Sequence, residues 1–133
     1  MREELDKLLC EKYPKMMVNR TKDMTETCMC WGFECADGWY NILDRLMGSI
    51  QNHLDWQNRN EEKVKQVTLD QVKEKFGTLR FYYTGGDDII DGMVRMAESM
   101  SAVTCEVCGA AGKLRGSYWL YTACDEHKKG FDE

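Results

Sequence analysis

The feature that most constrains this chain is a set of two short cysteine and histidine pairs near its C-terminus. Cys105 and Cys108 are separated by two residues, and after a further 15 residues Cys124 and His127 follow with the same separation. A Zn²⁺ ion takes four such sulfur and nitrogen ligands in a tetrahedron, so the spacing predicts one Zn²⁺ held by these residues. Because four protein ligands leave no open position for water, we expect the metal to be structural.

The segment between the two pairs predicts a β-hairpin. Residues 113–122, KLRGSYWLYT, are expected to form two short strands joined by a turn near Gly116 and Ser117. We expect the second ligand pair to begin a short helix that Thr122 caps. We call the turn that holds Cys105 and Cys108 the knuckle. A knuckle, a hairpin and the start of a helix, in this order, predict a treble-clef-like arrangement.

The rest of the chain predicts an α+β fold with a small antiparallel sheet, about three helices and this C-terminal zinc-bound hairpin. Apolar residues recur every three or four positions in the three expected helices, residues 2–13, 38–56 and 88–101. Asp37 and Asp87 are expected to cap the second and third of them. Strand character falls on residues 66–72 and 76–83, whereas residues 15–35 show no period and predict an irregular packed segment.

Length and charge narrow the class of protein. A chain of 133 residues predicts a single domain, 1–133, with a body at 1–103 and a zinc-binding subdomain at 104–133. The net charge of −5 disfavours tight binding to duplex nucleic acid. No apolar run is long enough to span a bilayer, and the charged N-terminus does not resemble a signal peptide, so a cytoplasmic protein is expected.

The sequence predicts no catalytic centre. Four cysteines lie outside the metal motif, and they are expected to be reduced, partly buried thiols: Cys10, Cys28, Cys30 and Cys35. His53 is the only histidine besides His127, and it falls beside the apolar stripe of the second helix. Phosphate-binding glycine loops and nucleophile elbows are absent from the sequence.

Two segments combine aromatic rings with cations, namely KEKFGTLRFYY at 73–83 and the hairpin at 113–122. A ring can stack on a nucleobase, and a guanidinium can pair two phosphate oxygens. The candidate residues for a small, nucleotide-like anion are Lys75, Arg80, Tyr82, Arg115, Trp119 and Tyr121. The alternative is ordinary strand packing, which fits Leu79, Phe81 and Tyr83 better than Arg80 and Tyr82, because the latter two fall on the opposite face.

Three motifs carry a resemblance to a known family. They are FECADGW at 33–39, QVKEKFGTLRFYY at 71–83, and CEVCG followed by a tryptophan and the C-x₂-H pair. Across residues 33–127 the chain resembles a family of small proteins encoded by tailed phages and prophages, which carries no settled activity. The resemblance implies a phage accessory protein that works in the host bacterial cytosol.

This setting leads to three hypotheses about function. The leading one is a non-catalytic binding protein that counters host antiphage immunity by sequestering a nucleotide-derived immune signal. The second is a protein–protein inhibitor of a host defence protein or host enzyme, and the third is a zinc module that binds nucleic acid. A homo-oligomer is compatible with each of them.

Overall fold

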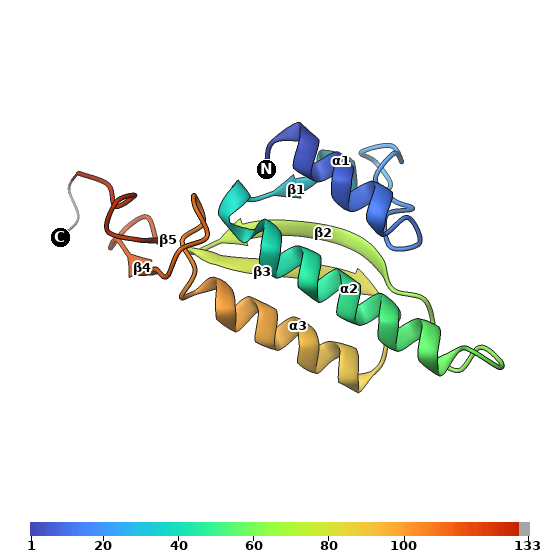
Figure 1. Cartoon of the computed structure of the whole chain (residues 1–133). Helices are drawn as coiled ribbons and strands as arrows, with labels where there is room; N and C mark the ends of the chain where they lie inside the picture. Colours follow the sequence, from blue (N-terminus) through green and yellow to red (C-terminus); the bar gives the residue numbers. More distant parts are fainter. Residues whose placement is uncertain (131–133) are drawn as a thin grey trace.

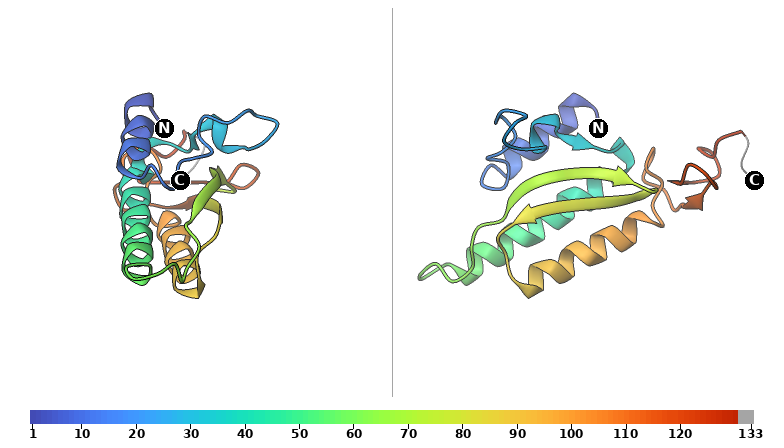
Figure 2. Two further views of the ribbon diagram at one scale, coloured as in Figure 1. Left: turned by 90° about the vertical axis from the view of Figure 1, so that its right-hand side faces the viewer. Right: turned by 180° about the vertical axis from the view of Figure 1, so that it is seen from behind.

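In a computed structural model, which describes residues 1–130, three α-helices form a layer against one face of a three-stranded sheet (Figures 1 and 2). The elements in chain order are α1 (Glu3–Lys12), η1 (Met29–Trp31), β1 (Phe33–Glu34), η2 (Asp37–Trp39), α2 (Tyr40–Gln57), β2 (Thr68–Lys75), β3 (Thr78–Thr84), α3 (Asp88–Ser101), β4 (Lys113–Arg115) and β5 (Tyr121–Ala123). The small β4–β5 sheet projects from the end of the larger sheet where β2 turns into β3 (Figure 1).

The predicted α+β class with three α-helices is confirmed, but the main sheet is mixed. β2 lies between β1 and β3, antiparallel to β3 and parallel to β1, with Phe33 in register with Val72. Parallel strands need a crossover connection, and α2 supplies it between β1 and β2. The sequence did not reveal β1 because a strand of two residues shows no alternation.

The core lies between the sheet and the helices. The apolar stripe of α2 is buried as predicted, and its buried members are Leu43, Leu46, Met47, Ile50 and Leu54. Val72, Leu79 and Phe81 face this stripe from the sheet, and Ile90, Val94 and Ala97 join them from α3. In the described part of the chain, no helix combines the length and apolarity of a membrane span.

The free edge of β3 is closed by side chains of α3. The backbone N–H of Leu79 donates to Ser101 Oγ at 2.9 Å, and that of Phe81 donates to Glu98 Oε2 at 3.0 Å. The hydroxyl of Tyr83 also donates to Asp91. Unpaired edge strands invite pairing with other chains, and these contacts remove the donors on which such pairing depends.

One predicted helix cap is confirmed and one is wrong. Asp87 caps α3, since its Oδ1 accepts from the N–H of Ile90 at 3.0 Å, and a hydrogen bond from His53 lowers the pKa of Asp87. Asp37 does not cap α2, because it lies within η2 and its carboxylate accepts from the N–H of Arg2 at 2.8 Å. The extra turn of η2 shifts the start of α2 to Tyr40.

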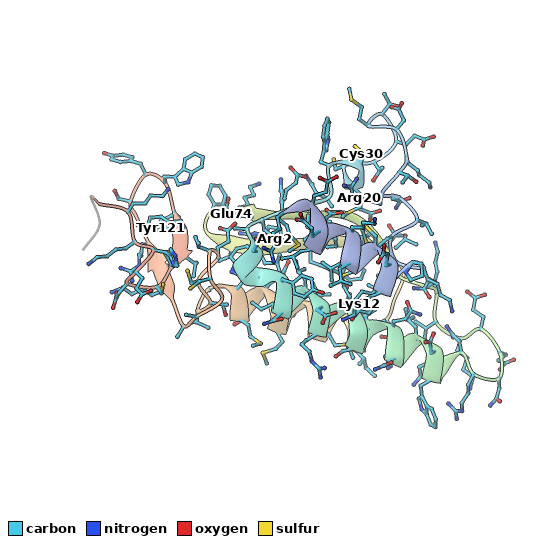
Figure 3. All side chains as sticks on the ribbon, turned by 45° about the horizontal axis from the view of Figure 1, so that its top comes forward. Arg2, Lys12, Arg20, Cys30, Glu74 and Tyr121 are labelled. Carbon is cyan, nitrogen blue, oxygen red and sulfur yellow. The ribbon has the colours of Figure 1, made fainter. Side chains whose placement is uncertain are left out.

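The segment before β1 is irregular, as predicted, and a buried carboxylate anchors it. Asp6 of α1 accepts hydrogen bonds from the N–H of Phe33 at 3.0 Å and from Arg20 Nε at 3.1 Å. Arg20 in turn donates from Nη1 to the carbonyl of Cys30 at 2.8 Å, which places the two residues side by side (Figure 3). These bonds tie the loop to α1 and to the start of β1.

The turn between β2 and β3 holds a strained residue. Lys75 pairs with Thr78, so the turn consists of Phe76 and Gly77 alone, with φ angles of 54° and 84°. Two positive φ values define the tight turn that suits the twist of a hairpin, and the first position normally carries Asn, Asp or Gly. Phe76 has no such tolerance, and its ring is 63% exposed.

This strain gives a stability prediction. We expect Phe76→Asn to raise the free energy of unfolding by about 1 kcal/mol, because Asn adopts the left-handed conformation at lower cost. Urea denaturation of the variant would measure the change. Phe76→Ala is the matched control, since it removes the ring but keeps the strain; equal stability of the Asn and Ala variants would contradict the explanation.

Candidate metal centre and anion-binding face

The structure brings the four predicted metal ligands together. Cys105 Sγ lies 3.7 Å from His127 Nδ1, Cys108 Sγ lies 3.7 Å from Cys124 Sγ, and Cys124 Sγ lies 3.2 Å from His127 Nδ1. All four ligand atoms fall within 4.8 Å of one another. A tetrahedral ion with metal–sulfur distances of about 2.3 Å would place its ligand atoms about 3.5–3.8 Å apart. The cluster therefore has the dimensions of a four-ligand metal site.

The backbone around the cluster prepares a thiolate. Burial raises the pKa of Cys105, but hydrogen bonds from the N–H groups of Cys124, Cys108 and Val107 outweigh it and lower the pKa to about 6. A metal binds the thiolate form, so this ligand needs little further deprotonation at neutral pH. By contrast, the pKa of Cys10 is raised to about 11 and that of Cys35 to about 12, in both cases mainly by burial.

The hairpin between the ligand pairs forms as predicted, but the predicted helix start is wrong. β4 and β5 pair in antiparallel register, and residues 116–120 connect them. Cys124 and His127 lie in a single turn, in which the N–H of His127 donates to the carbonyl of Cys124 at 3.2 Å. Thr122 does not cap this turn, because it is buried in β5 and its hydroxyl donates to the carbonyl of Gly77 at 2.6 Å. Residues 131–133 of the predicted subdomain lie outside the described residues.

The first ligand pair packs directly on the chain before α2. The N–H of Gly38 donates to the carbonyl of Glu106 at 2.7 Å, the N–H of Ala36 donates to Glu106 Oε2 at 2.9 Å, and Trp39 Nε1 donates to the carbonyl of Thr104 at 2.9 Å. A Cβ atom on Gly38 would lie 2.2 Å from the carbonyl oxygen of Cys105. Only glycine permits this approach, so the knuckle and η2 form one packed unit.

The hairpin packs on the β2–β3 turn in the same way. A Cβ atom on Gly77 would lie 2.5 Å from Leu114 Cδ1, and Thr122 holds the carbonyl of the same glycine. Glu74 and Tyr121 lie on the two sides of this junction (Figure 3). The three motifs that carry the family resemblance, at 33–39, 71–83 and 105–127, therefore meet at one junction around the metal ligands.

The second candidate site is the face of the sheet that points away from the helices. Viewed from behind, the sheet lies in front of α2 and α3, and no helix covers its middle (Figure 2). Lys73 of β2 lies directly opposite Arg80 of β3, and Gln71 lies opposite Tyr82. Like charges in directly opposite positions destabilise a sheet unless something neutralises them.

Within residues 1–130, no ion pair involves these cations. Neither Lys73, Lys75 nor Arg80 forms an ion pair there, although Glu34 is in register with Lys73 on β1. Arg80 Nε is buried and finds no hydrogen-bond acceptor among the same residues. A buried donor without an acceptor is uncommon and calls for an explanation.

A hollow of about 420 Å³ borders the same face of the sheet at Gln71 and Tyr82. Its walls are Tyr82 and Gln71 from the sheet and the loop of residues 24–28, with Asp70 at the base of the strand. The ring of Tyr82 is 45% exposed and borders the hollow, whereas Asp70 is held by the hydroxyl of Thr84 at 2.8 Å. The hollow thus presents a flat ring together with two carboxylates, Glu26 and Asp70, and the cations of the open face do not line it.

The structure divides the six predicted anion-binding residues into two groups. Lys75, Arg80 and Tyr82 share the open face of the sheet. Arg115 is buried in the hairpin, where it donates to the carbonyl of Ala123 and to Asp125, and Tyr121 is buried beside it with its hydroxyl bonded to the N–H of Lys129. Trp119 is 69% exposed in the hairpin loop, beyond the β2–β3 turn.

Sequence reasoning missed Lys73 and Glu106. The signal for Lys73 was available, because the alternation of β2 and its pairing with β3 place Lys73 opposite Arg80 once the two-residue turn is known. Glu106 had no such signal, since its contact with Ala36 joins residues that are far apart in the chain.

Comparison with protein-family models, with curated proteins and with solved structures finds no match to this chain. The resemblance to the phage family therefore stays a prediction from the three sequence motifs.

The cluster predicts a metal content. We expect one tightly bound metal ion per chain, and Cys108→Ser should abolish it, because three ligands hold a metal far more weakly than four. Elemental analysis of freshly purified protein would measure the stoichiometry. Cys28→Ser is the matched control, since Cys28 is also an exposed thiol but lies outside the cluster. Full metal content in the Cys108 variant would exclude these ligands.

Proposed function

We propose that this chain is a non-catalytic binding protein that holds a nucleotide-like anion on the open face of its sheet. The observation that carries the proposal is the pair of Lys73 and Arg80, which form no ion pair in the described residues, beside the exposed ring of Tyr82. The two cations would take the phosphate oxygens, and the ring would stack on the base. Lys75, one step further along the same face, would extend the contact to a second phosphate.

We further propose that the metal is Zn²⁺ and that its role is structural. Three thiolates and one imidazole are the donors that zinc prefers, and four protein ligands leave no site for a substrate or a reactive water. The ion would fix the knuckle and the hairpin against η2 and the β2–β3 turn. It would thereby fix the end of β2 and β3 at their connecting turn, and these two strands carry the proposed anion-binding residues.

In the phage setting that the resemblance implies, the anion would be a nucleotide-derived immune signal of the host. Sequestration needs only affinity, which agrees with a site that offers cations and a ring but shows no arrangement of nucleophile and base in the described residues. Inhibition of a host protein is the alternative function, and a separate surface, described below, favours a protein partner. Binding to duplex nucleic acid is disfavoured by the net charge of −5.

Arg80→Ala tests the proposal. We expect the variant to bind its nucleotide more weakly by about 1.5–3 kcal/mol, the contribution of a hydrogen bond to a charged group. Isothermal titration calorimetry with a cyclic dinucleotide, ADP-ribose and inorganic pyrophosphate would identify the class of anion. Tyr82→Ala should cost about 1–3 kcal/mol with the two nucleotides and leave pyrophosphate binding unchanged, because only the nucleotides can stack.

Arg95→Ala is the matched control for the arginine substitution. Arg95 is an exposed arginine of α3, on the helical layer and not on the open face of the sheet. Metal content should be unchanged in all three variants. The absence of heat and of a thermal shift with every anion would refute the proposal, and equal affinity of wild type and Arg80→Ala would place the site elsewhere.

A further inference from the structure

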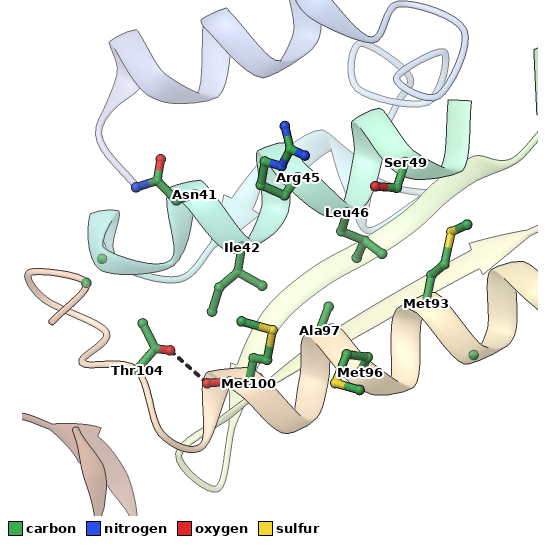
Figure 4. Close-up of a pocket in the computed structure, with 13 residues that line it drawn as sticks. Asn41, Ile42, Arg45, Leu46, Ser49, Met93, Met96, Ala97, Met100 and Thr104 are labelled. Atoms are coloured by element: carbon green, nitrogen blue, oxygen red, sulfur yellow. Dashed lines mark hydrogen bonds between the residues drawn. The ribbon is translucent and has the colours of Figure 1, made fainter. Parts of the chain in front are cut away.

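A long apolar groove runs between α2 and α3 on the surface that points away from the sheet. It encloses about 660 Å³, and its floor is made by Ile42, Leu46, Met93, Ala97 and Met100 (Figure 4). Gly109, next to the metal ligand Cys108, borders one end together with Thr104. This groove belongs to neither the metal centre nor the anion-binding face.

Exposed apolar side chains extend the groove into a stripe. Ile89 and Met96, seven residues apart on α3, are 58% and 63% exposed, and Val103, in the turn after α3, is 60% exposed. A spacing of seven residues places side chains on the same side of a helix after two turns. Met100 is also 49% exposed, so the outer side of α3 offers water a continuous apolar strip. Such strips on a folded domain mark interaction sites.

The shape and chemistry of the groove fit a helix. Its lining on α3 runs from Gly92 to Met100, which corresponds to about 12 Å, or a little over two turns of a helix. Three methionines line it, and their flexible, polarizable side chains adapt to an apolar partner. Helices that bind in grooves of this kind present apolar residues at i, i+3, i+4 and i+7.

Charge identifies the chemistry of the occupant. Arg45 is the charged residue of the lining, and it rises from α2 at the rim of the groove (Figure 4). Its guanidinium has no ion pair with any residue that the structure describes. The groove thus carries one unpaired cation at its rim, on a chain whose net charge is −5.

This rim disfavours a second copy of the chain as the occupant. In a two-fold symmetric contact, groove would face groove, and Arg45 of each copy would meet a lining that offers no carboxylate. A separate protein with glutamate or aspartate beside its apolar face would satisfy both the floor and the rim. We propose that the groove between α2 and α3 binds an acidic amphipathic helix of a partner protein.

The test uses a synthetic probe of that chemistry. The probe is a fluorescein-labelled helical peptide of 14 residues with leucines at i, i+3, i+4 and i+7 and glutamates on both flanks. Two matched peptides replace either the glutamates by lysine or the leucines by serine. Fluorescence anisotropy should show saturable binding of the first peptide, and at least tenfold weaker binding of the other two.

Variants of the full chain locate the site. Met96→Glu should weaken binding of the glutamate peptide at least tenfold, since it adds a charge to the apolar strip. Arg45→Glu should reverse the preference in favour of the lysine peptide, and the fold should tolerate the change because Arg45 is exposed. Val18→Glu is the matched control, because Val18 is 51% exposed but lies outside the groove.

Three other outcomes would overturn the proposal. Failure of the glutamate peptide to bind, or equal affinity in Met96→Glu and wild type, would exclude this groove as its site. Sedimentation that shows a wild-type dimer, dissociated by Met96→Glu, would assign the groove to a second copy instead. The anion-binding proposal is tested separately, because Met96→Glu should leave calorimetric binding of anions unchanged.

Discussion

The rest of the structure depends on the contact between the first pair of metal ligands and the backbone at Gly38. The carbonyl of Glu106 accepts the N–H of Gly38 at 2.7 Å, and Trp39 reaches back to the carbonyl of Thr104. Trp39 is itself fully buried in the core against which α2 packs. The candidate metal ligands are therefore joined to the main core through backbone contacts.

The sequence predicts features that depend on residues close together in the chain, and it misses features that depend on residues far apart in the chain. The helices at 38–56 and 88–101 were predictable because their periodicity is local, and so were the four metal ligands because their spacing reflects one tetrahedron. β1 was not predictable, since its two residues gain strand geometry only from pairing with β2. The cap at Asp37 failed for a similar reason: Arg2, from the start of the chain, takes its carboxylate.

The two proposed binding surfaces lie on opposite layers of the molecule. Lys73, Arg80 and Tyr82 belong to the open face of the sheet, whereas the groove lies on the outer side of α2 and α3. Both surfaces adjoin the candidate metal centre. The strands β2 and β3 contact the hairpin at Gly77, and the groove ends at Gly109, next to Cys108. A structural metal at the junction would thus support an anion site and a protein site at once.

The most direct measurement of this account is amide hydrogen exchange with and without bound metal. Removal of the metal by a chelator should speed exchange in residues 104–127 and also in two distant segments, residues 36–39 and 76–81. These segments contact the knuckle and the hairpin through Gly38 and Gly77, so they should lose protection together with the ligands. Faster exchange confined to residues 104–127 would contradict the account, because the hairpin would then unfold independently of the body.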